Sequence, residues 1–232
     1  QSENENKYWQ QEVLMEMLNE MPIIQLMLER TEADDIIAYV TKSPKYKGWQ
    51  KVIISSDKDF IQLLDDETVL YRPIAKKAMN KKSVIEEFGI SPQNFAIARA
   101  MAGDKSDNLE GIRGAGLKTI SKRLPTLREE KDHYLNDIYE MCEGTDSKVK
   151  FYSDVVDNWN TVELNYKVMN LVPPSISVQG TQKINYALDN FEPELNATEL
   201  RKTSISNGFG SYNWETYIAA LRGVIMKRKR IA

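Results

Sequence analysis

Hydrophobic and polar positions follow two different patterns along the chain, and the change falls near residue 90. Before that point, short runs of β-branched residues predict strands, and segments with apolar residues three or four apart predict helices between them. Strands that alternate with helices indicate a parallel sheet in an α/β fold. The predicted strands span residues 51–56 and 69–71, and the predicted helices span residues 32–43, 58–65 and 83–88.

After residue 90 the pattern is helical only. Ser91-Pro92 is a helix-start signal, and apolar residues from Phe95 to Met101 share one helix face. Further helices are expected at residues 134–142, 147–160 and 212–226, and one near the N-terminus from Tyr8 to about Pro22, with residues 1–7 frayed. We therefore expect a sheet-based domain at 1–90 and a helical subdomain at 91–232.

Composition limits the possible chemistry. The 232 residues include one cysteine, Cys142, and one histidine, His133, which excludes a disulfide framework and a Cys/His zinc site. Any metal must then be held by oxygen, which favours Mg²⁺ or Mn²⁺. The sequence has no apolar run long enough to span a membrane, so we expect a cytoplasmic protein with no membrane partner.

The net charge of −3 argues at first against nucleic-acid binding, but the basic residues are clustered. An ordinary solvated surface remains an alternative for each cluster. The clusters are Arg113, Lys118, Lys122, Arg123 and Arg128; then Arg72, Lys76, Lys77, Lys81 and Lys82; and finally Lys227-Arg228-Lys229-Arg230.

Acidic residues occur in three short motifs. Thr31-Glu32-Ala33-Asp34-Asp35 opens a helix, Ser55-Ser56-Asp57-Lys58-Asp59 follows a strand, and Gly103-Asp104-Lys105-Ser106-Asp107-Asn108 follows a helix. Ligands of parallel α/β sheets bind at the carboxyl ends of strands, where the second motif lies. For the first motif alone, we favour a different interpretation, an acidic capping cluster at the N-terminus of a helix, where the helix dipole stabilises negative charge.

A glycine-rich hairpin, Gly111-Ile112-Arg113-Gly114-Ala115-Gly116, follows the third motif. Gly114 and Gly116 permit positive φ angles and a close approach of phosphate to main-chain N–H groups, and Lys118 and Thr119 can add a charge and a hydroxyl. A P-loop is excluded because Leu117 separates Gly116 from Lys118. A simple helix C-cap remains an alternative for Gly114.

Taken in order, the three acidic motifs and the hairpin resemble the 5′ nuclease superfamily, which includes flap endonucleases, the 5′→3′ exonuclease domains of bacterial polymerases and phage ribonuclease-H-type replication nucleases. The resemblance covers residues 30–125 and is nearest to the phage group. It implies a PIN-like nuclease core with a parallel sheet, and a C-terminal helix–three-turn–helix subdomain that grips duplex DNA.

The same resemblance implies roles for individual residues. Seven carboxylates would converge, and two divalent ions would balance their repulsion and serve phosphodiester hydrolysis. We expect catalytic roles for Asp34, Asp57, Asp59 and Asp104; metal binding by Glu32, Asp34, Asp35, Asp57, Asp59, Asp104 and Asp107; and DNA contacts from Gly111, Arg113, Gly114, Gly116, Lys118, Thr119 and Lys122. A K⁺ ion at the hairpin is a further implication.

The expected substrate is duplex DNA with a 5′ end, a flap or an RNA primer, and replication proteins are the expected partners. A phage-encoded protein would act inside the infected bacterial cell. In the family, a strand with an essential aspartate, a second aspartate and a basic helical arch precede the part that corresponds to residue 1. We therefore expect an upstream segment, rather than another part of this chain, to pair with the strand at 52–56. Two alternatives stay open: a non-catalytic structure-specific DNA-binding module, and a PIN-type ribonuclease, which would not need the hairpin.

Overall fold

The computed structural model describes the chain from residue 2 to residue 231, with side chains as far as Met226. Its three-stranded sheet has the order β1-β2-β3. The strands are β1 (Lys51–Ile54), β2 (Thr68–Arg72) and β3 (Lys77–Met79). β1 and β2 are parallel, as expected, whereas β2 and β3 are antiparallel. β3 was not predicted from the sequence, because it has three residues and no β-branched residue to mark it, and it adds an antiparallel edge to the sheet.

β1 has one paired edge. It hydrogen bonds to β2 in the register that puts Lys51 opposite Thr68 and Ile54 opposite Tyr71. Among residues 2–231, no strand pairs with its other edge. Ile53 points into the core with 6% of its surface exposed, while Val52 and Ile54 are 55% and 69% exposed. Pairing of this edge with an upstream segment remains a prediction.

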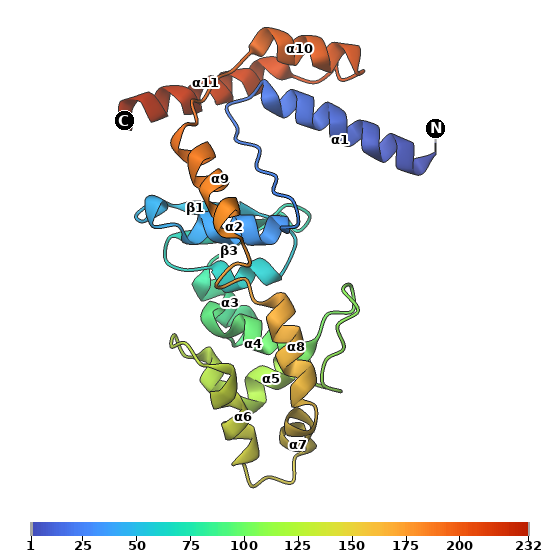
Figure 1. The fold of residues 1–232 in the computed structure, drawn as a ribbon, viewed down its shortest axis with the longest axis vertical. Helices are drawn as coiled ribbons and strands as arrows, with labels where there is room; N and C mark the ends of the chain where they lie inside the picture. The colour runs from blue at the N-terminus through green and yellow to red at the C-terminus, as the bar shows by residue number, and fades with distance from the viewer. Residues whose placement is uncertain (1, 232) are drawn as a thin grey trace. The chain divides into compact units, whose positions relative to one another are not determined.

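Two compact units divide the chain, one of residues 30–176 and the other of residues 1–29 with 177–232. The first unit contains the sheet and seven α-helices (Figure 1). These helices are α2 (Ala33–Lys42), α3 (Lys81–Phe88), α4 (Phe95–Ala102), α5 (Leu117–Arg123), α6 (Leu135–Glu143), α7 (Lys150–Asp157) and α8 (Trp159–Met169). Short 3₁₀ turns also occur in this unit: η1 (Pro44–Tyr46), η2 (Asp59–Leu63), η3 (Pro92–Asn94) and η4 (Pro125–Arg128).

The core of the first unit is built around α4. All residues from Phe95 to Met101 are buried, so this helix has no solvent-facing side. α8 packs along it, and the buried Asn165 amide of α8 donates to the carbonyls of Ala100 (2.9 Å) and Glu110 (2.7 Å). These bonds tie α8 to the start of the glycine hairpin, because Glu110 directly precedes it.

The expected helices at 32–43 and 83–88 are confirmed as α2 and α3, and Gly89 ends α3 with φ of 66°. The single helix expected at 147–160 is wrong, because Asn158 ends α7 and starts α8. The domain boundary predicted near residue 90 falls inside the first unit, where one hydrophobic cluster includes residues on both sides of it. That boundary stays a prediction.

The second unit consists of four helices, α1 (Glu3–Asn19), α9 (Val178–Asp189), α10 (Ala197–Ser206) and α11 (Trp214–Ile231). The frayed start expected for residues 1–7 is wrong for residues 2–7, since Ser2 and Glu5 form a capping box that begins α1 at Glu3, and Gln1 lies outside the described residues. A small core of Val13, Met17, Met21, Leu200 and Ile218 joins α1, α10 and α11. Helices α9 and α10 were not predicted from the sequence.

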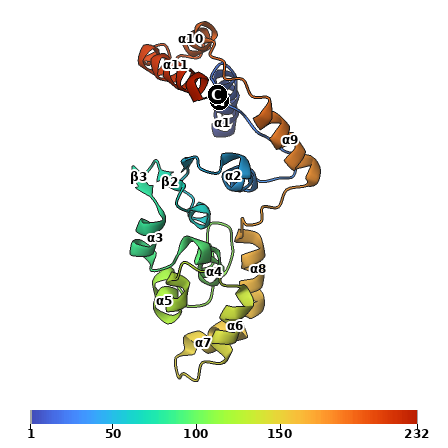
Figure 2. The same cartoon turned by 90° about the vertical axis from the view of Figure 1, so that its left-hand side faces the viewer.

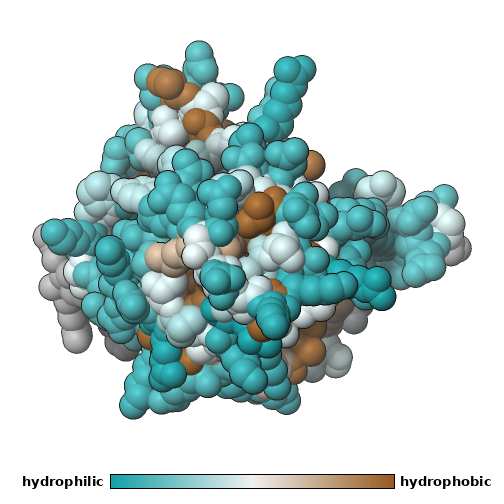
Figure 3. All heavy atoms as spheres, turned by 90° about the horizontal axis from the view of Figure 1, so that it is seen from below, coloured by the Kyte–Doolittle hydropathy of each residue, from teal (hydrophilic) through white to brown (hydrophobic). Residues whose placement is uncertain are grey.

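Within the first unit, α6 and α7 lie at the end remote from the sheet in both ribbon views (Figures 1 and 2). Seen from that end, the molecular surface is mainly hydrophilic, with small separated hydrophobic areas (Figure 3). The acidic motifs lie elsewhere, on the segments around β1, α2 and the C-terminus of α4.

Candidate functional site

The first acidic pair follows β1 in a tight turn. The Asp57 N–H donates to Ser55 Oγ (3.1 Å), and Asp57 Oδ1 accepts from the Asp59 N–H (2.8 Å). These local bonds let serine and aspartate side chains direct the backbone from the strand into η2. Asp57 is exposed and Asp59 is half-buried, so Asp59 points further into the unit.

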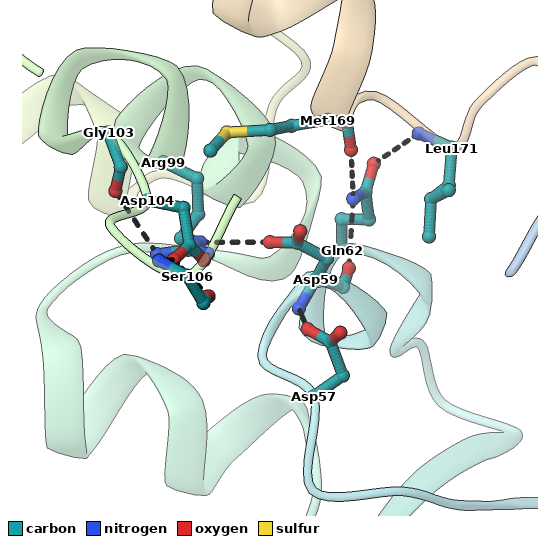
Figure 4. A network of polar contacts seen from close by, with 9 residues as sticks. All are labelled: Asp57, Asp59, Gln62, Arg99, Gly103, Asp104, Ser106, Met169 and Leu171. Carbon is teal, nitrogen blue, oxygen red and sulfur yellow. Dashed lines mark hydrogen bonds and ion pairs between the residues drawn. The ribbon is translucent and has the colours of Figure 1, made fainter. Parts of the chain in front are cut away.

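Gln62 anchors the turn that carries Asp59. Its buried amide nitrogen donates to the carbonyls of Asp59 (2.8 Å) and Met169 (2.9 Å), and its oxygen accepts from the Leu171 N–H (2.8 Å). Figure 4 shows this amide between η2 and the chain that leaves α8. Because all three partners are backbone groups, Gln62 fixes the position of the turn whatever side chains surround it.

The second acidic pair lies in a closed loop after α4. Gly103 ends the helix with φ of 73°, and Asp104 and Leu109 exchange two backbone hydrogen bonds of 2.9 and 2.8 Å. Asp104 Oδ1 also accepts from the N–H (2.8 Å) and the hydroxyl of Ser106. The loop holds Asp104 inward, while Asp107 at its tip is exposed.

Arg99 joins the two acidic pairs, and the sequence analysis missed it. Its Nε donates to Asp59 Oδ1 (2.8 Å), its Nη2 to Asp104 Oδ2 and its Nη1 to the Gly103 carbonyl (3.4 Å). The residue is 8% exposed. An arginine inside the apolar run from Phe95 to Ala102 was the available signal, because a buried arginine needs acidic partners.

Three carboxylates converge around this arginine. One oxygen each from Asp59, Asp104 and Asp107 lies within 4.8 Å of the others. At about 5 Å and an effective dielectric of 20, each like-charged pair repels by about 3 kcal/mol. Among the residues described, Glu32, Asp34, Asp35 and Asp57 join no group of three acids at that spacing.

The acids around the start of α2 lie beside this cluster. Burial raises the pKa of Asp34, and the charges of Asp57, Glu32 and Asp59 raise it further, so these acids are electrostatic neighbours. Asp35 Oδ1 accepts from the Ser175 N–H (2.7 Å). Glu32 is the N-cap residue of α2, but its side chain makes no capping hydrogen bond. A pure capping role therefore does not account for Glu32.

The two carboxylates that pair with Arg99 have pKa values shifted in opposite directions. Burial raises the pKa of Asp59, although the hydrogen bond and charge of Arg99 oppose that rise. Asp104 is less buried, and hydrogen bonds from the Ser106 hydroxyl and then Arg99 lower its pKa to about 2. Arg99 and Ser106 thus favour the ionised form of Asp104, whereas Arg99 does not fully offset the cost of burying a charge on Asp59.

The donor set fits a divalent metal ion. Three carboxylates from two segments supply only oxygen, which suits Mg²⁺ or Mn²⁺ rather than a soft metal. Arg99 contributes one positive charge against the three negative charges, so the cluster still favours a cation.

The glycine hairpin continues directly from the loop of Asp104 and Asp107. Residues 108–116, together with Ala102, Gly103 and Lys105, line one depression of about 720 Å³. Gly111 packs so closely that an added Cβ would lie 2.0 Å from the Ala102 carbonyl oxygen, and Gly114 has φ of 77°. The expected positive φ of Gly116 is wrong: it adopts φ of −68° as the N-cap of α5, a conformation open to any residue.

The basic clusters differ in how many of their side chains form ion pairs. Lys77, Lys81 and Lys82 are paired with Glu87, Asp66, Glu130 and Glu86, so the second cluster is largely neutralised. In the part of the chain that the structure describes, no ion pair involves Arg113, Lys118 or Lys122 of the first cluster. The side chains of Lys227–Arg230 lie outside the described residues. Free positive charge is therefore found beside the hairpin, where the predicted DNA contacts lie.

Comparisons with known proteins agree with these features. Residues 3–89 match the family model of the 5'-3' exonuclease N-terminal resolvase-like domain. The 5'-3' exonuclease of Aquifex aeolicus is 39% identical over 107 residues, which span 46% of this chain and 37% of that protein. DNA polymerase I of Streptococcus pneumoniae is 38% identical over 138 residues, which span 56% of this chain and 15% of that protein. The chain thus matches well under half the length of these curated relatives.

Solved structures share the fold. Phage T5 5'-exonuclease with bound divalent ions (zinc) superposes with a TM-score of 0.64 at 18% identity, over 83% of this chain and 73% of that chain. A phage T5 flap endonuclease in a complex with DNA and metal ions gives a TM-score of 0.57 at 19% identity, over 71% and 62% of the two chains. None of the described helices is long and apolar enough to cross a membrane.

Proposed function

We propose that this chain carries the catalytic face of a metal-dependent 5′ nuclease, the superfamily that the matches to known proteins support. The proposed reaction is hydrolysis of phosphodiester bonds at 5′ ends or flaps of duplex DNA. The proposal includes removal of primers or flaps during replication, in the cytoplasm of a bacterial or phage-infected cell, because relatives include bacterial DNA polymerase I.

One observation carries the proposal. Asp59 and Asp104 come from segments 45 residues apart, yet they converge with Asp107 to within 4.8 Å. Arg99 pairs with only two of these carboxylates, so a cation bound at the cluster would relieve the repulsion that remains. The chain has one histidine and one cysteine, so a nucleophile held by a Cys/His arrangement is not a competing explanation.

The residues have distinct proposed tasks. Asp59, Asp104 and Asp107 would hold the ion nearest to Arg99, and Asp34 and Asp57 would complete a second position beside it. Divalent ions bound there, Mg²⁺ or Mn²⁺, supply activation of the attacking water and neutralise charge on the leaving 3′ oxygen. Gln62 and Ser106 keep the carboxylates oriented through the backbone and side-chain bonds described above.

The hairpin would hold the duplex next to these acids. Gly111 and Gly114 allow the backbone to approach phosphates, and Arg113, Lys118 and Lys122 provide unpaired positive charge. Thr119 adds a hydroxyl within α5, and a K⁺ ion bound by hairpin carbonyls is part of the same proposal. Such contacts read no bases, so binding should depend on DNA structure rather than on sequence.

The test is a cleavage assay with the full-length protein and end-labelled substrates. We expect Mg²⁺-dependent cleavage of a 5′-flap duplex, little cleavage of single-stranded RNA, and no cleavage in EDTA. Duplex binding without cleavage at any Mg²⁺ or Mn²⁺ concentration would favour the non-catalytic DNA-binding module. Preferred cleavage of single-stranded RNA, unaffected by Lys118→Ala, would favour the PIN-type ribonuclease.

A further inference from the structure

Arg99 is a buried charged residue to which the proposed reaction assigns no role. It is the only charged residue on α4, a helix buried on every side, and its guanidinium is aimed at the acidic cluster. An arginine placed merely to fill space could have been replaced by an apolar residue at less desolvation cost. Its charge therefore serves the acids that it contacts.

The contacts of Arg99 are to atoms that a metal ion would need. Its Nε and Nη2 donate to Asp59 Oδ1 and Asp104 Oδ2, and these carboxylates are two of the three in the cluster. Asp107, the third, is exposed and receives no hydrogen bond from Arg99 among the described residues. The guanidinium thus occupies the buried side of the cluster and leaves its solvent side open.

We propose that Arg99 is a resident counter-cation, which holds Asp59 and Asp104 together without metal and lowers the affinity of the cluster for divalent ions. This inference rests on the proposed function, because it assumes that the cluster binds metal. An ion entering from the Asp107 side meets a fixed positive charge and must share both carboxylates with it. Metal binding then weakens the Arg99 pairs, and the ion takes over their role of balancing charge.

Metal binding distinguishes two roles that Arg99 could have. A purely structural arginine would, when removed, lower stability equally with and without metal, and would leave metal affinity unchanged or lower. A counter-cation would, when removed, lower stability chiefly without metal and raise metal affinity. The two roles therefore predict metal affinities that move in opposite directions.

The experiment compares the full-length wild type with Arg99→Met and Arg99→Lys, in the absence of DNA. Methionine keeps much of the side-chain length without charge, and lysine keeps the charge without the guanidinium fork. Mn²⁺ binding is measured by the electron paramagnetic resonance signal of free Mn²⁺. We expect Arg99→Met to bind Mn²⁺ about tenfold more tightly than the wild type, as expected for loss of one nearby opposing charge, and Arg99→Lys to stay within about threefold of it.

The second measurement is the thermal unfolding temperature, determined in EDTA and in saturating Mn²⁺. Arg99→Met should unfold at a lower temperature than the wild type in EDTA, and most of that deficit should disappear in Mn²⁺. Unchanged or weaker Mn²⁺ affinity, or an equal deficit under both conditions, would overturn the proposal.

A measurement on the wild type covers the case in which Arg99→Met does not fold. The Nε–H resonance of Arg99, assigned with Arg99→Lys as the reference, should shift when diamagnetic Mg²⁺ is added. A resonance that stays unchanged through saturation would contradict a counter-cation role. If instead the wild type binds no Mn²⁺ and Asp59→Asn behaves identically, the metal site fails, and with it the proposed function rather than the role of Arg99 alone.

Discussion

The two acidic groups near the end of β1 differ in how their charge is balanced. The loop acids, Asp59, Asp104 and Asp107, surround a buried arginine, which pairs with two of them. The α2 acids, Glu32, Asp34 and Asp35, have no ion pair within the described part of the chain, and Asp35 accepts only a backbone N–H.

This difference shows that neighbouring acids can follow opposite electrostatic rules. Where Arg99 and Ser106 are present, ionisation of Asp104 is favoured, and its negative charge contributes to stability. Where no such partner is present, burial and neighbouring charges oppose ionisation of Asp34. An added cation should therefore relieve more strain at the α2 acids, while the loop acids keep their arrangement without one.

The largest expected effect is on activity. Asp104→Asn and Asp57→Asn should each reduce Mg²⁺-dependent flap cleavage by about 100-fold or more, because changes even to residues that only support a metal ligand cost 10–100-fold. Single-turnover cleavage by the full-length protein measures this. Asp146→Asn, in the loop between α6 and α7, is the control and should keep wild-type activity. Full activity in both Asp57 and Asp104 variants would remove these acids from the reaction.

The next effect tests the backbone that supports the loop acids. Gly111→Ala would place a Cβ 2.0 Å from the Ala102 carbonyl oxygen, and this carbonyl directly precedes Gly103 and Asp104. We expect a loss of about 3 kcal/mol in the free energy of unfolding. Gly114→Ala is the matched control, since its Cβ meets nothing within 4 Å and only its φ of 77° is unfavourable; it should lose about 1 kcal/mol. Urea denaturation gives both values, and equal losses would refute the packing argument.

The third prediction compares how the two acidic groups affect the free energy of unfolding in EDTA. Asp104→Asn should lower the free energy of unfolding by about 1–2 kcal/mol, because it weakens charged hydrogen bonds at a partly solvated site. Asp34→Asn should raise it, by less than about 1 kcal/mol after solvent screening. Two changes of the same sign would show that the groups are not differently balanced.

These stability differences should depend on pH in opposite ways. Asp104 has a pKa lowered from 3.8 to about 2, so its contribution is present above pH 4 and is lost as the pH falls from about 4 to 2. The pKa of Asp34 is raised above 3.8, so its penalty is present at neutral pH and disappears as the pH falls through that raised value. Urea unfolding of the wild type and both variants across this range should show the Asp34→Asn difference vanish at higher pH than the Asp104→Asn difference. The reverse order would contradict the assignment.

The smallest expected effect is on the salt dependence of DNA binding by the hairpin, which lies outside both acidic groups. Lys118→Ala should reduce the slope of log binding constant against log salt by about 0.9, the value for one duplex phosphate contact. It should leave metal binding unchanged, because Lys118 pairs with none of the acids. Filter binding to two unrelated duplex sequences at several salt concentrations measures the slope. A change confined to one sequence would mean that the hairpin reads bases.

The sequence was most informative where its signals are local. The strand at β1, the helix after Glu32 and the end of α3 at Phe88 were all predicted correctly, and the ordered acidic motifs led to a resemblance that the family model matching residues 3–89 supports. β3 and the break at Asn158 were missed because a three-residue strand and a single-residue interruption leave almost no pattern. Gly116 was misjudged because a glycine does not by itself reveal the sign of φ.

The site was predicted less completely than the fold. Three of the seven expected acids converge, and the distances among them depend on Arg99 and Gln62, whose partners lie up to 109 residues away. No periodicity in the sequence encodes such long-range hydrogen bonds. A buried arginine between alanines on α4 was visible in the sequence, but its acidic partners could be identified only once the fold placed η2 beside α4.

The most direct test of the central claim is anomalous diffraction from crystals of the full-length protein soaked in Mn²⁺. The account predicts an anomalous peak with oxygens of at least two of Asp59, Asp104 and Asp107 within about 2–2.5 Å, the range of hard-cation ligands. The Arg99 guanidinium should remain on the buried side of that peak. No peak among these carboxylates at saturating Mn²⁺, with peaks only on other surface acids, would contradict the claim that the loop acids form the metal site.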